Sequence, residues 1–303
     1  MNCMLSTGKM RDRVFWNQRV KQLVAKLLVA TTAIVIAVVV FRWGLLAGIQ
    51  SLFQLDESTV TVIRRMGLFC CVVLTYWAYV SFYEKRQASE LRPAPIRIAA
   101  GAFFGAAVIT LVSLILFATG VYQLQAYHGF NTALLGVAGV ILVAATIEEV
   151  VFRGILFQAL EQTWGTVPAL WLQSLLFSVL HIANLDTAMG TAELVMTVIS
   201  GTLIGAFWTL VFIQSRNLWV VSLNHAAWNF AVVLTGLPLS GLDDWGSVAP
   251  VESTYHGPNW LTGGGVGPED SVITVVVVTI LLVVMVLWAR KTQRFIKPVT
   301  GEK

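Results

Sequence analysis

Side chains that can carry acid–base chemistry occur in three segments of the chain that are otherwise apolar. In chain order they are Glu148, Glu149, Arg153, His181, His225 and Asn229. Ionisable groups at membrane depth are rare and energetically costly, and they usually serve a function. Carboxylates, imidazoles and an amide are the groups that activate a water molecule and stabilise the negative charge formed by its attack. The residues therefore predict a catalytic site assembled from three helices.

The two adjacent glutamates have unlike surroundings within their own helix. Glu149 and Arg153 are four residues apart with the acid on the N-terminal side, the favoured orientation for a helical ion pair. Glu148 has no such partner in its helix, and an unpaired carboxylate in an apolar site is suited to take a proton from water. Glu148 is therefore predicted to be the general base, and Glu149 a group that positions the site.

Two roles are open for the histidines and the asparagine. His225 and Asn229 share one helix face, so together they can bind a metal ion or donate hydrogen bonds to an oxyanion. His181 can ligate a metal or help Glu148 hold a water molecule. At about 1.5 Å of rise per residue, these groups lie roughly 10 to 22 Å from the cytoplasmic ends of their helices. They are predicted to share one cavity in the cytoplasmic half or middle of the bundle.

Each residue also has a purely structural explanation. A pair such as Glu149 with Arg153 can clamp a membrane protein together, and a histidine or asparagine in a span commonly bonds a neighbouring helix. Chains of Glu and His side chains also relay protons in transporters. A transporter would favour matched halves with helices broken by Gly or Pro, and the sequence has no such halves. The gathering of these residues in three segments favours a catalytic site over packing alone.

Transmembrane helices are the elements that must hold these residues. Hydrophobic residues make up 57% of the 303 positions and charged residues only 12%, and the mean hydropathy is +0.76. Soluble domains carry about 25% charged residues, so this composition predicts a membrane protein. Long apolar runs satisfy their backbone groups in lipid as helices, which predicts an all-α polytopic bundle. The eight predicted spans are 24–41, 66–83, 98–122, 132–160, 166–182, 192–214, 218–236 and 271–289.

The distribution of basic residues predicts the orientation of the bundle. With eight spans, sixteen Lys and Arg residues fall on the side that carries both termini, and only Arg42, Arg64 and Arg65 fall on the other. Cytoplasmic loops are rich in Lys and Arg, so both termini are predicted to be cytoplasmic. The loop 237–270 is then non-cytoplasmic, and neither helical nor strand periodicity is found in it. The basic charge lies mostly at membrane edges and predicts no nucleic-acid partner.

Small residues predict where helices approach one another. Gly101 with Gly105, and Gly201 with Gly205, are spaced four apart, which lets neighbouring backbones come close. Such contacts concern packing and carry no chemistry of their own.

The polar segments, taken together, resemble the motifs of a known family. They stand in the order found in the CPBP intramembrane proteases, which include the CAAX prenyl-protein endopeptidases and the Abi proteins linked to bacteriocin processing and self-immunity. The resemblance covers about residues 125–236. The motifs are Glu148-Glu149-x-x-x-Arg153, Phe177-x-x-x-His181 and His225-x-x-x-Asn229.

The resemblance implies a role for each motif position. Glu148, assisted by His181, would activate the attacking water. His225 and Asn229 would stabilise the oxyanion of the tetrahedral intermediate. The second glutamate and the arginine of the first motif would orient the site, and Phe177 would pack beside it.

The cofactor stays open, because the family has been described both as metalloproteases and as metal-independent glutamate proteases. Glu148, His181 and His225 can supply the three protein ligands of a catalytic Zn²⁺ or another divalent metal. The sequence has no His-Glu-x-x-His helix, which would be the usual zinc-protease signature. Water is the nucleophile under either description.

The predicted organisation has four parts: membrane helices without a motif at 1–122, a CPBP-like catalytic core at 123–236, the non-cytoplasmic loop at 237–270, and a last helix with a basic tail at 271–303. The predicted function is hydrolysis of peptide bonds in a membrane-associated or prenylated, CAAX-like protein or peptide. The predicted partners are the lipid bilayer and that substrate. A non-enzymatic self-immunity or scaffold protein is the alternative, followed by a proton-coupled transporter.

Overall fold

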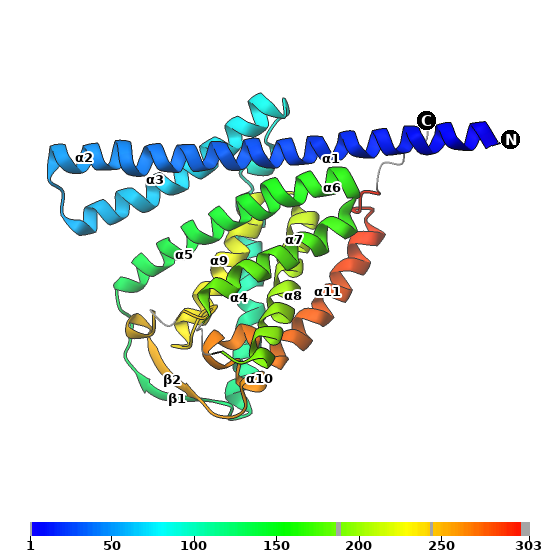
Figure 1. Cartoon of the computed structure of the whole chain (residues 1–303). Helices are drawn as coiled ribbons and strands as arrows, with labels where there is room; N and C mark the ends of the chain where they lie inside the picture. Colours follow the sequence, from blue (N-terminus) through cyan, green and yellow to red (C-terminus); the bar gives the residue numbers. More distant parts are fainter. Residues whose placement is uncertain (1, 186–188, 243–244, 298–303) are drawn as a thin grey trace. The chain divides into compact units, whose positions relative to one another are not determined.

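The computed structural model describes residues 2–185, 189–242 and 245–297, with side chains from Trp16 onward. Seven of the helices in these ranges are long and apolar enough to cross a membrane, and α9 (Leu218–Leu234) is a shorter apolar helix. With α9 counted, each of the eight predicted spans corresponds to one of these helices (Figure 1). The predicted fold class, a polytopic helical membrane protein, is confirmed.

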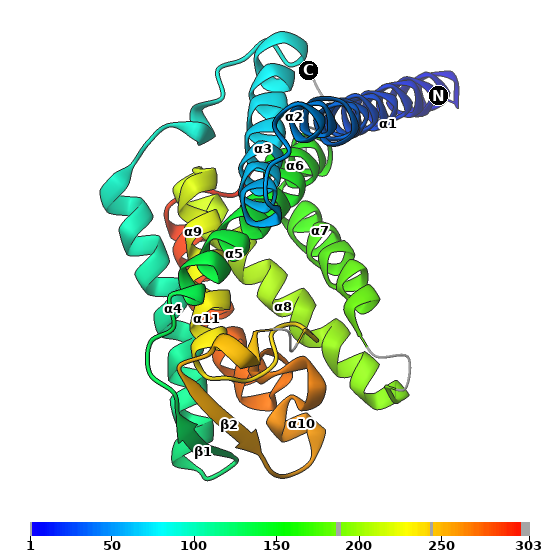
Figure 2. The same ribbon diagram turned by 90° about the vertical axis from the view of Figure 1, so that its left-hand side faces the viewer.

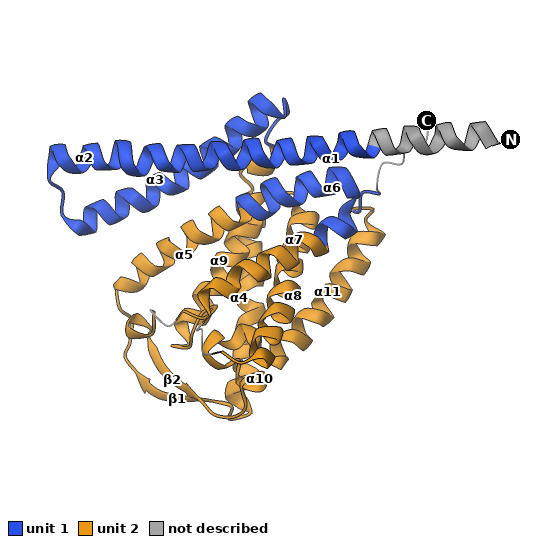
Figure 3. Ribbon diagram, viewed as in Figure 1, with its two compact units in different colours: residues 1–88, 150–170, 295–303 blue, residues 89–149, 171–294 orange. Residues whose placement is uncertain are grey.

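The chain divides into two compact units, which Figure 3 colours separately. Unit 1 comprises residues 1–88, 150–170 and 295–303. The first helix of this unit lies near the N-terminus, and its last helices follow Glu149 in the sequence. Its elements are α1 (Asn2–Val39), the π-helix η1 (Val40–Leu45), α2 (Leu46–Phe53), α3 (Glu57–Ala78), the π-helix η2 (Tyr79–Tyr83), the π-helix η4 (Val150–Phe157) and α6 (Gln158–Trp164).

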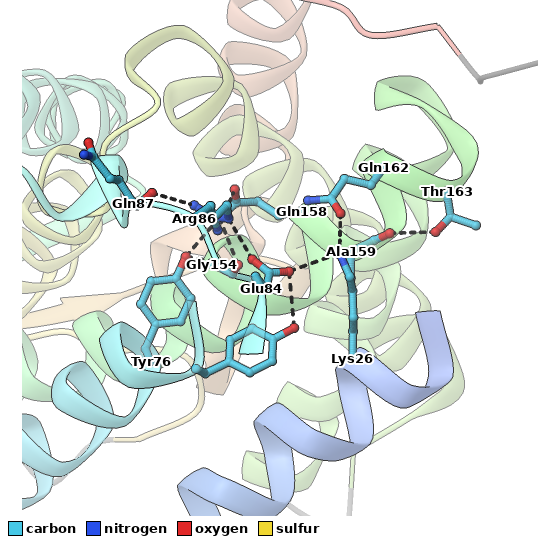
Figure 4. A network of polar contacts seen from close by, with 11 residues as sticks. Lys26, Tyr76, Glu84, Arg86, Gln87, Gly154, Gln158, Ala159, Gln162 and Thr163 are labelled. Atoms are coloured by element: carbon cyan, nitrogen blue, oxygen red, sulfur yellow. Dashed lines mark hydrogen bonds and ion pairs between the residues drawn. The ribbon is translucent and has the colours of Figure 1, made fainter. Parts of the chain in front are cut away.

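A polar network joins three elements of unit 1 (Figure 4). The nearly buried carboxylate of Glu84 lies 3.2 Å from Nζ of Lys26 on α1 and 2.7 Å from Nε of Arg86. The Lys26 ammonium also donates to Oε1 of Gln162 on α6. Gln158 on the same helix donates to the hydroxyl of Tyr76 at 3.0 Å. Two cations on one carboxylate, with amide partners, tie α1, α3 and α6 together within the unit.

Unit 2 comprises residues 89–149 and 171–294. It holds most of the spans and a small antiparallel ribbon at one end of them, which is visible in Figure 2 beside α10. Its remaining elements are α4 (Pro95–Ala118), β1 (Tyr122–Tyr127), α5 (Ala133–Glu149), α7 (Thr166–His181, in this unit from Trp171), α8 (Thr191–Ser215), β2 (Val251–Tyr255), α10 (Asn259–Thr262) and α11 (Val272–Lys291).

The segment 237–270 contains more regular structure than the sequence predicted. Strand β2 pairs antiparallel with β1, so that Tyr122 lies opposite Tyr255. The register shifts between Leu124 and Ala126, which marks a bulge. Short helices follow at α10, at Gly264–Val266 (η7) and at Pro268–Asp270 (η8). The expectation that this stretch lacks strand or helix was wrong, because five-residue and four-residue elements are too short to produce a periodic pattern.

Both glycine pairs lie where helices touch, as the sequence predicted. A methyl group at Gly101 would lie 2.9 Å from the carbonyl oxygen of Val220, and one at Gly105 would collide with the carbonyl of Asn224, so α4 packs closely on α9. A methyl at Gly201 would lie 2.6 Å from Oγ of Ser178, which places α8 against α7. These contacts bear directly on the two helices that carry the histidines.

Candidate functional site

Three helices of unit 2 bring the predicted chemical groups together. Glu148 and Glu149 are the last two residues of α5, and the π-helix η4 begins at the next residue. His181 is the last residue of α7, while His225 and Asn229 lie on α9. A π-helix is rare and is often found next to a functional site.

The carboxylate of Glu148 faces both histidines. Its Oε2 atom lies 3.9 Å from Nε2 of His181 and 3.9 Å from Nε2 of His225. These separations are too long for direct hydrogen bonds. Oε2 is nevertheless buried, and it has no hydrogen-bond partner among the residues that the structure describes. A polar contact of this length between buried groups is the geometry in which a water molecule bridges.

Contacts at the Nδ1 atoms of the two imidazoles fix the orientation of the rings. Nδ1 of His181 lies 2.8 Å from the carbonyl oxygen of Phe177, which can only accept, so Nδ1 carries the hydrogen. Nδ1 of His225 likewise lies 2.9 Å from Oε1 of Glu149. Each ring therefore presents Nε2 to the gap beside Glu148. In catalytic sites, a hydrogen-bond acceptor at one ring nitrogen commonly fixes the tautomer and the orientation of a histidine.

The second glutamate has a partner that the sequence did not predict. The side chain of Glu149 is fully buried, and its Oε1 atom lies 2.9 Å from Nδ1 of His225, whose side chain is 3% exposed. Arg153, its predicted partner, lies in η4 of unit 1 and is also fully buried. The pairing of Glu149 with Arg153 stays a prediction. The contact with His225 shows that Glu149 orients a histidine of the site.

Two aromatic rings enclose the histidines. The ring of Trp208, on α8, stacks on the imidazole of His225 with 3.6 Å between centroids and 23° between planes. Phe177 lies 4.2 Å from the ring of His181 and 6.3 Å from that of His225. Phe177 thus packs beside the site as the resemblance implies. The sequence did not predict Trp208 as a site residue, because a tryptophan in an apolar helix cannot be distinguished from a packing residue by its sequence alone.

Glu148, His181, His225 and Asn229 line one cavity, which has about 150 Å³ of space open to water. Glu149 stands behind His225 and is not part of the lining. The cavity is large enough for several water molecules or part of a peptide. Oδ1 of Asn229 is buried there, without a hydrogen-bond partner among the described residues. The cavity therefore offers unsatisfied polar groups to whatever enters it.

A second pair of acids also lines this cavity. Glu269 accepts from Nε1 of Trp228 at 3.0 Å and from Ser240 at 2.5 Å. Asp270 accepts hydrogen bonds from the hydroxyls of Thr197 and Ser200. The sequence patterns did not predict a role for these two acids. Their position directly before the last apolar helix was the available signal, because a loop residue joined to a span can reach the interior.

Burial sets the protonation behaviour of Asp270. Removal from water raises its pKa to about 6, and the neighbouring Glu269 adds to the rise, while the hydroxyl hydrogen bonds oppose it. Asp270 therefore titrates near neutral pH, at the wall of the cavity that holds the histidines.

The predicted metal ligands do not form a ready metal site. Among the described residues, no group of three or more His, Cys, Asp and Glu side chains is arranged to hold a metal ion. The 3.9 Å separations around Glu148 leave room for a water molecule between the groups.

Part of the chain matches a known protein family. The family model described as "Type II CAAX prenyl endopeptidase Rce1-like" matches residues 129–231. The curated proteins contain no match to the chain. The matched range begins before α5 and ends within α9, so it includes every predicted site residue.

Proposed function

We propose that this protein, whose residues 129–231 form a domain of the Rce1-like CAAX endopeptidase family, hydrolyses peptide bonds of a membrane-associated protein or peptide. The observation that carries the proposal is the position of Oε2 of Glu148, 3.9 Å from Nε2 of both His181 and His225 in one cavity. A carboxylate between two oriented imidazoles is suited to hold and deprotonate a water molecule.

The hydrogen-bonding capacity of the site supports a bound water. With both Nδ1 atoms protonated and the rings neutral, two Nε2 atoms and Oε2 of Glu148 present three acceptors to the same gap. A water molecule can donate to two of them. In the proposed mechanism one further proton, on Nε2 of His225, provides a donor to the water oxygen or to an oxyanion.

In the proposed reaction, Glu148 takes a proton as the water oxygen bonds to the carbonyl carbon of the substrate. The carbonyl π electrons move onto oxygen, and the resulting oxyanion accepts hydrogen bonds from His225 and Asn229. The C–N bond then breaks, and the proton held by Glu148 passes to the leaving nitrogen. The products are a carboxylic acid and an amine, and Glu148 returns to its carboxylate form.

The test compares the purified parent protein with Glu148→Gln on a panel of membrane peptides in proteoliposomes. Glutamine keeps the shape of the side chain but cannot take a proton, so we expect cleavage to fall about 10²- to 10⁴-fold. Glu252→Gln is the matched control, because Glu252 is an exposed acid on β2 and its neutralisation should leave cleavage unchanged.

Metal content measured on the same samples separates the two chemical descriptions. One zinc per chain with chelator-sensitive cleavage would add a Lewis acid to the Glu148 site. Full cleavage by metal-free protein would assign activation of the water to Glu148 and the histidines. Equal cleavage by the parent and Glu148→Gln would remove Glu148 from the mechanism. A Glu148→Gln chain that cleaves nothing yet preserves a cellular phenotype would favour the self-immunity or scaffold function.

A further inference from the structure

The two ends of unit 2 differ in their content of Lys and Arg. At one end, the segment before α4 contacts the start of α9. The side chain of Asn217 donates to the carbonyl oxygen of Arg92 at 2.7 Å, and that of Trp219 donates to the carbonyl oxygen of Leu91 at 2.8 Å. Six basic residues lie at or near this end. They are Arg92, Arg97, Arg216, Arg290, Lys291 and Arg294.

The opposite end is held together by different contacts, and its described residues include no Lys or Arg. Strands β1 and β2 pair there, Asn259 donates to Glu193, and the backbone N–H of Gly241 donates to the carbonyl of Val266 at 3.2 Å. The described segments that form it, 119–132, 182–185, 189–193, 235–242 and 245–271, contain no Lys or Arg. Because basic loops stay in the cytoplasm, this second end is the non-cytoplasmic one. We call it the ribbon end.

The walls of the catalytic cavity extend to the ribbon end. Its lining includes Asn184 and Leu185 after α7, as well as several residues of the 237–270 segment, among them Leu242, Trp245 and Asp270. Asn184 and Leu242 are exposed. None of the lining residues comes from the loops of the basic end. The cavity thus runs from the histidines toward the ribbon end.

A second cavity continues in the same direction. It shares Val266 and Asp270 with the catalytic cavity, so those two residues form a common wall. Its other walls include Met189, Met196 and Trp260, and it has about 470 Å³ of space open to water. Flexible methionines and an exposed tryptophan suit apolar residues of an extended peptide.

We infer that the catalytic site is reached from the non-cytoplasmic side, and that its substrate is a membrane-anchored polypeptide whose cleaved segment lies at that surface. A prenylated C-terminus in the cytoplasm would approach the basic end, to which the cavity does not extend. The inference rests on the proposed function. To that function it adds the side of the membrane from which the substrate enters and the class of substrate that is cleaved.

Two matched reporters test the inference in cells that express the full chain. Each carries the same cleavable segment next to a single transmembrane helix, placed on the non-cytoplasmic side in one reporter and on the cytoplasmic side in the other. We expect at least tenfold more cleavage of the first, lost in Glu148→Gln.

The other outcomes are distinct. Glu148-dependent cleavage of the cytoplasmic reporter, alone or equally with the first, would overturn the inference while leaving the proteolytic function intact. Cleavage of neither reporter, together with no cleavage of the peptide panel, would overturn the proposed function and the inference with it. Cleavage of the panel but of neither reporter would overturn the inference alone.

Thiol labelling provides an independent readout of the side. In a chain whose native cysteines (Cys3, Cys70 and Cys71) are replaced by serine, Leu242→Cys places a thiol at the cavity rim, and Lys291→Cys places one at the basic end. A membrane-impermeant maleimide added to intact cells should label Leu242→Cys and block cleavage, but should not reach Lys291→Cys. The reverse labelling pattern would contradict the orientation.

Discussion

At the scale of single residues, the site depends on how firmly His225 is held. Glu149 fixes its Nδ1, and Trp208 covers one face of the ring at 3.6 Å. A catalytic group must keep its position within a fraction of an ångström, so side chains that restrain it contribute to rate without touching the substrate. Trp208 is therefore a positioning residue in the proposed mechanism.

Replacing Trp208 tests this role. Trp208→Leu removes the stacked ring, and we expect kcat to fall about tenfold with KM little changed, since an interaction that aligns the reacting groups is lost. Trp208→Phe keeps a ring and should recover most of the rate. Trp171→Leu is a control on the exposed face of α7. Equal losses in both leucine variants would indicate general damage to the fold.

Asp270 gives a prediction about pH. Its pKa in the folded protein, about 6, lies above the ordinary value of 3.8, so the fold favours the protonated form. The contribution of Asp270 to the free energy of unfolding should therefore be most favourable below pH 3.8. It should become less favourable as the pH rises toward about 6. The loss is on the order of 3 kcal/mol at most.

Asp270→Asn mimics the protonated form and should remove that part of the pH dependence. Thermal unfolding of the parent and the variant in detergent, measured between pH 4 and 7, gives the difference directly. A difference between the two proteins that does not change with pH would show that Asp270 titrates at its ordinary value.

At the scale of elements, the glycines of α4 determine where α9 lies. Gly105→Ala would drive a methyl group into the carbonyl of Asn224, one residue before His225. We expect the free energy of unfolding to drop by about 1–3 kcal/mol and cleavage to fall with it, because α9 must shift. Gly136→Ala is the matched control, since a methyl there meets nothing within 4 Å. Comparable losses in both variants would contradict the close α4–α9 contact.

The sequence predicted the helices and the polar set, but not how the set is connected. Long apolar runs and four-residue spacing are local signals, and they identified α5, α7 and α9 with their Glu, His and Asn residues. The partnership of Glu149 with His225, 76 positions away, depends on how helices pack, which no local spacing encodes. For the same reason, Trp208 and Asp270 could not be told from ordinary span and loop residues.

At the scale of the whole molecule, each compact unit has its own buried polar contacts. Unit 2 has the hydrogen bonds of Glu269 and Asp270, and unit 1 contains the network around Glu84, whose side chain is 8% exposed. Lys26 and Arg86 both pair with that carboxylate. Removing its charge leaves two partly buried cations without their main partner.

Glu84→Gln should therefore destabilise the protein by about 1–3 kcal/mol while leaving the groups of the catalytic cavity unaltered. Thermal unfolding in detergent measures the first effect, and the cleavage rate of the surviving folded protein measures the second. Glu57→Gln, at an exposed position at the start of α3, serves as the control. An unchanged melting temperature in Glu84→Gln would mean that the network adds nothing to stability.

The range that matches the family model and the cavity do not have the same boundaries. Residues 129–231 contain all the groups proposed to carry out the reaction, whereas Leu242, Trp245, Val266 and Asp270 of the cavity wall lie beyond that range. The groups proposed to react thus lie within residues 129–231, whereas part of the cavity wall is supplied by the segment that follows. For the proposed protease, exchanging the 237–270 segment for that of a protein that matches the same family model should change which substrates are cleaved while leaving Glu148 and the histidines in place.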